Sequence, residues 1–94
     1  GNIFAAGFEK KLNELIDAAF RKANNLKPGD NLSEKGNLFD NKITFNYNWM
    51  VNKDGSLTFY YNPYEIAPYA AGPLEVTLTK AEITPLLSEN SPLK

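Results

Sequence analysis

Near the start of the chain, apolar side chains recur every three or four residues. They stand at Phe8, Leu12, Leu15, Ile16, Ala19, Phe20 and Ala23. This is the spacing of one face of an α-helix over about four turns, so we expect a helix over 8–23. On its polar side, Asp17 and Arg21 have the acid-first i,i+4 order of a helical ion pair. The residues after it are of helix-ending types, namely Asn24, Asn25, Pro28 and Gly29.

Further along, apolar and polar residues alternate over 43–51, which predicts a strand with its odd-numbered residues buried. Two more strands are expected over 57–61 and 74–78. Odd positions must face inward on both of the first two strands, so paired residues must have numbers with an even sum. A three-residue loop over 53–55, with Gly55 in a left-handed conformation, meets this condition. The pairs it predicts are Val51 with Leu57, Trp49 with Phe59, and Tyr47 with Tyr61.

The connection over 28–42 is polar and rich in turn-forming residues. We expect it to be ordered, with one short turn of helix that Asp30 caps and Gly36 closes. Its apolar residues are expected to fold back as anchors, namely Leu32, Leu38 and Phe39. Near the end of the chain, Thr79 and Glu82 fit a capping box before a short helix that Pro85 limits.

These elements predict an α+β fold in which one long amphipathic helix packs on a small, three-stranded antiparallel sheet with a short C-terminal helix. We expect residues 1–87 to form a single domain and residues 88–94 to form a frayed tail. Three strands offer more apolar surface than one helix covers. We therefore also expect the sheet to be part of a larger one in the parent protein.

Composition removes many functions. The 94 residues include ten basic and eleven acidic side chains, with no basic run longer than Lys10-Lys11 or Arg21-Lys22, which argues against nucleic-acid partners. The chain has neither Cys nor His, so thiol nucleophiles, imidazole bases and nearly all zinc or copper sites are absent. No apolar run reaches membrane-spanning length. We expect a fragment of a longer protein, without cofactor or direct membrane insertion.

Carboxylates are the remaining candidates for chemistry. Glu65 and Glu75 flank a tyrosine-rich stretch, and paired carboxylates are what glycoside hydrolysis requires. Eleven acids in a chain of this length produce such pairs by chance, so we expect no enzymatic activity. The acidic turns at Asp30-Asn31 and 52–55 do not continue into the oxygen-ligand pattern of a calcium loop, and no metal site is expected.

The most informative stretch, residues 60–73, holds three prolines, four tyrosines and one glycine. One interpretation is packing, in which Pro63 and Gly72 fix the path of the backbone and the rings close a small core. The other is recognition, because a stiff loop rich in tyrosine loses little entropy on binding. The candidate partner-binding residues are Tyr64, Glu65, Pro68 and Tyr69.

The string over 59–72 reads FYYNPYEIAPYAAG and precedes the strand over 74–78. It resembles the signature of a bacterial envelope domain of unknown function. That domain forms the C-terminal part of the extracytoplasmic region of RsiV-type anti-sigma factors, which sense lysozyme, and occurs in some peptidoglycan deacetylases and Bacteroidetes lipoproteins. The predicted elements follow the family's order, so the resemblance covers nearly the whole chain.

The resemblance implies a non-catalytic α+β domain in the periplasm or at the cell surface, lipid-anchored where its parent is a lipoprotein. Two hypotheses follow from it. In the first, the domain is a module whose loop residues Tyr64, Glu65, Pro68 and Tyr69 bind lysozyme or a similar envelope protein. In the second, it is a carbohydrate-associated domain that stacks tyrosines on peptidoglycan or assists an attached deacetylase.

Overall fold

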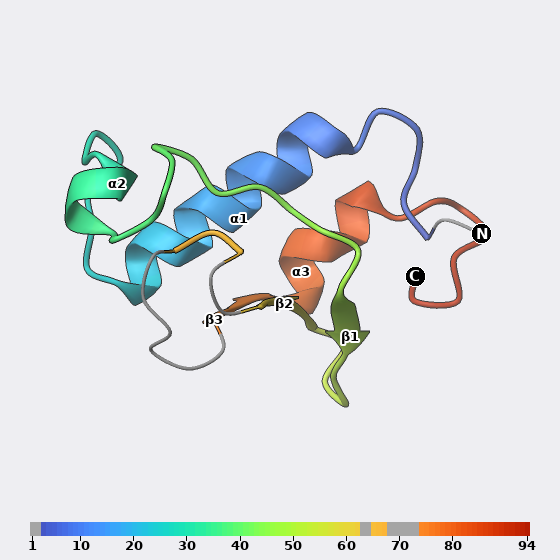
Figure 1. Ribbon diagram of the computed structural model, residues 1–94. Helices are drawn as coiled ribbons and strands as arrows, with labels where there is room; N and C mark the ends of the chain where they lie inside the picture. Colours follow the sequence, from blue (N-terminus) through green and yellow to red (C-terminus); the bar gives the residue numbers. More distant parts are fainter. Residues whose placement is uncertain (1–2, 63–64, 68–73) are drawn as a thin grey trace.

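A computed structural model describes residues 3–62, 65–67 and 74–94 and has the predicted α+β arrangement (Figure 1). The long helix α1 lies across one face of a three-stranded antiparallel sheet with strand order β1-β2-β3. Its elements are α1 (Glu9–Ala23), α2 (Leu32–Lys35), β1 (Trp49–Val51), β2 (Leu57–Tyr61), β3 (Leu74–Leu78), α3 (Lys80–Ile83) and the 3-10 turn η1 (Thr84–Leu86).

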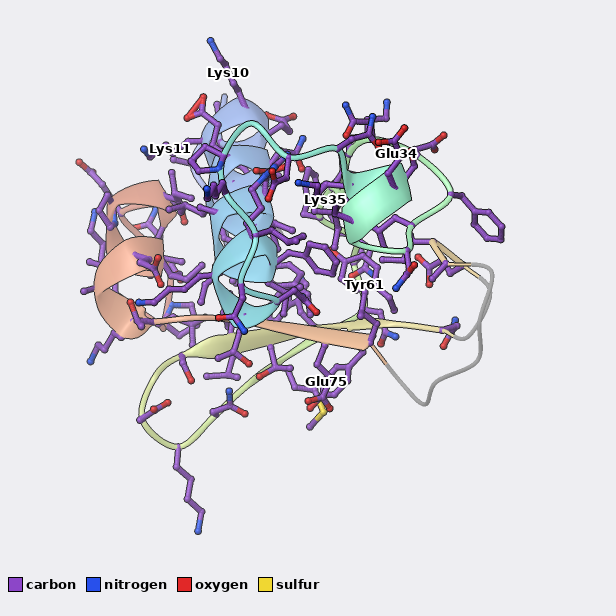
Figure 2. All side chains as sticks on the ribbon, turned by 90° about the vertical axis from the view of Figure 1, so that its left-hand side faces the viewer. Lys10, Lys11, Glu34, Lys35, Tyr61 and Glu75 are labelled. Atoms are coloured by element: carbon purple, nitrogen blue, oxygen red, sulfur yellow. The ribbon has the colours of Figure 1, made fainter. Side chains whose placement is uncertain are left out.

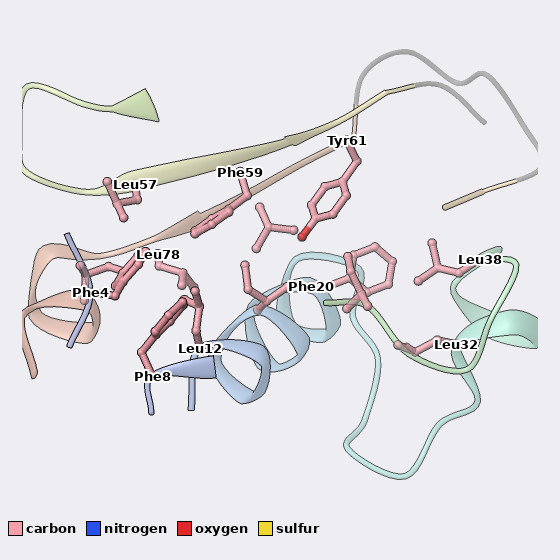
Figure 3. Packing of buried hydrophobic residues seen from close by; sticks show 14 of the residues in the cluster. Phe4, Phe8, Leu12, Phe20, Leu32, Leu38, Leu57, Phe59, Tyr61 and Leu78 are labelled. Carbon is pink, nitrogen blue, oxygen red and sulfur yellow. The ribbon is translucent and has the colours of Figure 1, made fainter. Parts of the chain in front are cut away.

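The core lies between α1 and the sheet, as the helical spacing predicts. Leu12, Ile16 and Phe20 point from α1 toward the sheet and are buried. Figure 3 shows Phe59 and Tyr61 of β2 directed toward them. On the polar side of the helix, Arg21 Nε lies 2.6 Å from Asp17 Oδ1, which confirms the expected ion pair. Asn24 caps the helix, and Asn25 follows with a φ of 58°.

The hairpin between β1 and β2 has the register that parity predicts. Trp49 pairs with Phe59 and Val51 with Leu57. Gly55 has a φ of 87°, which confirms the left-handed position at the end of the loop. Inside the turn, the side chain of Asp54 accepts hydrogen bonds from the amide and hydroxyl of Ser56, both within 2.9 Å.

The first strand is shorter than expected. It begins at Trp49, so the predicted strand over 43–48 and the pairing of Tyr47 with Tyr61 are wrong. The Asn46 side chain explains the difference, because its Nδ2 donates to the Tyr60 carbonyl at 2.8 Å and its Oδ1 accepts from the Asn48 amide at 2.9 Å. These side-chain bonds replace the regular ladder of a strand. Tyr47 and Val51, both expected to be buried, are exposed.

The connection between α1 and β1 contains the expected turn of helix, α2, closed by Gly36. Its N-terminal cap is Asn31 rather than Asp30, since Asn31 Oδ1 accepts hydrogen bonds from the backbone amides of Ser33 and Glu34. Asp30 instead accepts from the Lys27 amide at 2.8 Å. Two of the three expected anchors, Leu32 and Leu38, are buried, whereas Phe39 faces solvent and is not an anchor.

The C-terminal part closes the fold. Thr79 and Glu82 form the predicted capping box at the start of α3. Phe4 and Leu87 form an antiparallel bridge, flanked by a 2.8 Å bond from the Ser88 amide to the Ile3 carbonyl. The segment expected as a frayed tail has defined contacts, because Ser91 is buried and Leu93 packs against the core. In the described part of the chain, no helix has the length and apolar character to cross a membrane.

Candidate functional site

The tyrosine and proline loop that the sequence singles out is only partly described. Glu65 is described, together with its neighbours Ile66 and Ala67. The other predicted binding and structural residues lie outside the described residues, namely Tyr64, Pro68, Tyr69, Pro63 and Gly72. The site can therefore be built from the base of the loop and from the surface that surrounds it.

The base of the loop is fixed by short-range hydrogen bonds. The Glu65 amide donates to the Asn62 carbonyl at 3.0 Å, and the Asn62 amide donates to Glu65 Oε1 at 2.9 Å. The Ile66 carbonyl accepts from the Phe39 amide at 2.8 Å, and Ile66 and Ala67 pack against the core. Because both backbone and side chain take part, Glu65 is held in one place at the surface.

Tyr61 supports this base from inside the molecule. Its ring is buried between the sheet and the helices (Figure 2), and its hydroxyl donates to the Thr44 carbonyl at 2.5 Å. Burial, with a further contribution from the negative charge of Glu65, raises the pKa of the Tyr61 hydroxyl well above its ordinary value. The protonated hydroxyl is the hydrogen-bond donor that ties Tyr61 to the Thr44 carbonyl.

Next to the base of the loop lies a surface on which Phe39 is the prominent apolar side chain, with 54% of it exposed. A small pocket of about 90 Å³ is lined by Phe39, Asp40, Lys42, Ile43, Thr44, Glu65 and Ile66, and we call these residues the Phe39–Glu65 surface. Two of them are acidic and one is basic. An exposed ring beside the fixed carboxylate of Glu65 is suited to contact with another macromolecule.

The sequence pattern does not single out Phe39, because Leu38 and Phe39 are both apolar and equivalent as candidate core anchors. In the structure Leu38 is buried, whereas Phe39 lies at a bend of the chain and points outward. The adjacency of two large apolar residues in the sequence does not indicate which of them faces solvent.

A second group of aromatic rings lies near β1. Tyr47 is 76% exposed, and its ring meets the Phe45 ring edge-on at 5.5 Å and 82°. Phe45 in turn contacts the buried ring of Phe8 at 5.3 Å. Tyr47 is therefore connected to the core through the Phe45 ring, while most of its own ring remains exposed to solvent.

The two glutamates considered for glycoside chemistry lie on different elements. Glu65 is in the turn at the base of the loop, and Glu75 is on β3, paired with Tyr60 across the sheet. Figure 2 shows Glu75 on the face of the sheet opposite α1, whereas Tyr61 lies on the α1 side. Over residues 3–62, 65–67 and 74–94, no three acidic side chains gather as a metal site would require.

Comparison with known proteins adds a relationship without a known activity. Residues 1–81 match the model of a family described as a protein of unknown function, DUF3298. The chain is also similar to the crystal structure of a DUF3298 member from Bacteroides fragilis, with a TM-score of 0.81 and 26% identity. The alignment covers 97% of this chain and 36% of that protein, so this chain spans about a third of that relative. None of the curated proteins matches it.

Proposed function

This chain belongs to the DUF3298 family, and we propose that it is a non-catalytic binding module that docks an envelope protein such as lysozyme through the Phe39–Glu65 surface. The partner class rests on the resemblance of residues 59–72 to the RsiV-type anti-sigma factors. The same resemblance supports a location outside the cytoplasmic membrane. The observation that carries the docking surface is the exposed Phe39 ring beside Glu65.

Phe39 is suited to be the central contact with a partner because its backbone is already fixed. Its amide is bonded to the Ile66 carbonyl, and the preceding residue, Leu38, is locked in the core. A partner that covers the exposed part of the ring gains about half of the ~1.5–3 kcal/mol that complete burial of such a side chain contributes, and orders only a few side-chain torsions. Aromatic side chains at such positions are common centres of binding energy.

The charges around the ring favour a basic partner. Asp40 and Glu65 line the same small pocket, and Lys42 is the basic side chain beside them. Complementary charge raises the rate of association and excludes acidic partners more than it raises affinity. We therefore expect binding to weaken as salt is added, because the exposed carboxylates are screened.

The experiment is a calorimetric titration of the chain with lysozyme. We expect Phe39→Ala to raise the dissociation constant at least about tenfold. Glu65→Gln removes the charge but keeps the shape, so its effect is smaller and disappears at high salt. Lys22→Ala, on the exposed side of α1, is the matched control and binds as the wild type does. The loop variants Tyr64→Ala and Tyr69→Ala test the sequence-based prediction in the same titration.

Thermal melting of each variant comes first, so that a loss of binding is not a loss of fold. The substitution at Phe39 removes an exposed side chain and leaves the core intact. If folded Phe39→Ala binds lysozyme with wild-type affinity, this surface is not the docking site. If the wild-type chain shows no heat of binding with lysozyme, that partner is excluded.

The alternative function, association with peptidoglycan, is favoured by Tyr47. Its open ring, supported by Phe45, presents the flat apolar face that can stack on a sugar. Co-sedimentation with insoluble peptidoglycan distinguishes the two functions. A carbohydrate-associated domain loses sedimentation in Tyr47→Ala and keeps it in Phe39→Ala, whereas a protein-binding module does not sediment in either variant.

A further inference from the structure

β1 is an edge strand whose outer backbone groups are unpaired. The Tyr60 amide donates to the Asn48 carbonyl at 2.9 Å, and the Asn52 amide donates to the Ser56 carbonyl at 2.8 Å. Even-numbered residues of β1 therefore direct their backbone groups toward β2. The N–H and C=O groups of Trp49 and Val51 must then point away from the sheet, where no described residue pairs with them.

The side chains of this edge are apolar and exposed. Of the four large apolar side chains exposed in the described part of the chain, two lie on β1, namely Met50 (61% exposed) and Val51 (41% exposed), and a third, Tyr47, lies two residues before it. Protein sheets usually protect an edge with charge, proline or a bulge. The opposite edge, β3, has Glu75 at its surface, whereas Trp49–Val51 has no charged residue.

We propose that β1 pairs in antiparallel fashion with β1 of a second copy of this chain, with the two-fold axis at Met50. Trp49 of each copy then exchanges both backbone hydrogen bonds with Val51 of the other, and the two Met50 side chains meet at the axis. The sheets of the two copies become one continuous sheet. Every outward backbone group of Trp49–Val51 is then satisfied.

The edge is complementary to itself in this register. Centring on Met50 is the one arrangement in which all three residues of β1 pair with β1 of the second copy, because a shift moves a partner outside the strand. The net charge of −1 leaves little repulsion between copies.

A cross-linking experiment tests the register. The chain has no cysteine, so Met50→Cys introduces a single thiol at the proposed axis. The residues at the axis form a non-hydrogen-bonded pair with Cα atoms about 4.5 Å apart, within the range of a disulfide. With oxidised glutathione as the oxidant, we expect Met50→Cys to form a disulfide-linked dimer. The control Thr77→Cys, exposed on β3, should remain monomeric.

Sedimentation equilibrium tests the association without a cross-link. Val51→Pro removes an outward N–H and leaves the bonds to β2 in place, so we expect at least about a tenfold weaker dimer. Thr77→Pro removes an outward N–H on the free edge of β3, together with the hydrogen bond between the Thr77 and Thr58 hydroxyls, and should leave the dimer unchanged. Val51→Lys, which places a charge on the edge and keeps every N–H, gives a second test if the proline variant does not fold.

Circular dichroism and thermal melting establish that each variant is folded. A wild-type chain that remains monomeric at millimolar concentration overturns the proposal. So does a dimer that Val51→Lys and Thr77→Pro leave equally strong, because the contact then lies elsewhere. Since lysozyme is not present in these measurements, their outcome is independent of the proposed binding function.

Discussion

Helix α1 and the segment over 43–48 pack on the same core but are held to it in different ways. From α1, Leu12 and Ile16 are completely buried. The segment over 43–48 has one buried residue, Ile43, and its path is set by amide side chains. Asn13 of α1 accepts from the Phe45 amide at 2.9 Å, and Asn46 bridges to the Tyr60 carbonyl.

The difference separates two roles of a side chain. Burying a large apolar side chain contributes about 1.5–3 kcal/mol and does not depend on direction. A hydrogen bond contributes about 1 kcal/mol but fixes the position of one atom relative to another. We infer that α1 supplies stability, whereas the amides of the 43–48 segment decide where β1 begins.

The largest effect is expected where apolar burial is complete. Ile16→Ala leaves a cavity under the sheet, and we expect it to lower the free energy of unfolding by about 2–5 kcal/mol. Urea denaturation measures the change, with Lys10→Ala on the exposed side of α1 as control. A loss below about 1 kcal/mol would mean that α1 is not the source of stability.

A smaller effect is expected at the hairpin, where neither apolar burial nor a side-chain bond is changed. Gly55→Val forces a branched residue to a φ of 87° and brings its Cβ to 2.8 Å from Lys80 Cδ. We expect a loss of about 1 kcal/mol or more in urea denaturation. Gly29→Val, at a glycine with open space around its Cβ position, is the control. Equal losses in both variants would contradict the strain argument.

The amide bonds of the 43–48 segment are tested by Asn46→Ala. The substitution removes the bonds to the Tyr60 carbonyl and from the Asn48 amide, and we expect a loss of about 1 kcal/mol. Amide hydrogen exchange is the more specific measurement, because protection should fall at Asn48 while the amides of α1 are unaffected. Asn90→Ala is the control at an exposed asparagine. Unchanged exchange at Asn48 would show that the side chain does not set the path.

The smallest effect concerns the acidic turn of the hairpin. The Ser56 hydroxyl and then the Ser56 amide, which donate to Asp54, hold the pKa of that carboxyl below its ordinary value. The carboxylate therefore stabilises the folded state above the unfolded pKa of about 3.9, and this contribution is lost as the pH falls through the lower folded pKa. We expect the melting temperature of the wild type to fall slightly more than that of Asp54→Asn between pH 5 and about pH 2. If the melting temperatures of the two proteins fall equally with pH, the Asp54 carboxylate does not stabilise the folded state.

The elements that could be predicted from sequence depend on local pattern or local chemistry. The helix needed only its spacing, the hairpin only parity and Gly55, and α3 only Thr79 and Glu82. The 43–48 segment could not be predicted, because its alternation is that of a strand while the deciding bonds run from Asn46 to a carbonyl on another element. The choice of Asn31 over Asp30 as cap depends on one residue of offset, which composition does not reveal.

In the candidate site, too, one residue could be predicted from the sequence and another could not. Glu65 was identified from its place in a distinctive loop, and the structure holds it in a turn at the surface. The prediction that Phe39 is a core anchor is wrong, because hydrophobicity in the sequence does not give the direction of a side chain. Its direction depends on which of Leu38 and Phe39 reaches the core, and this is settled by long-range packing around α2.

The bridge between Phe4 and Leu87 holds together two segments that lie near opposite ends of the chain (Figure 1). A domain built in this way can be inserted into a surface loop of a host protein through two short linkers, because these two segments lie side by side. Mechanical tension on the two ends would act first on this bridge and its flanking backbone bonds, opening them one after another before the sheet is loaded. The ends could equally be joined and the chain reopened at the 53–55 hairpin loop, giving a circular permutant with the same core.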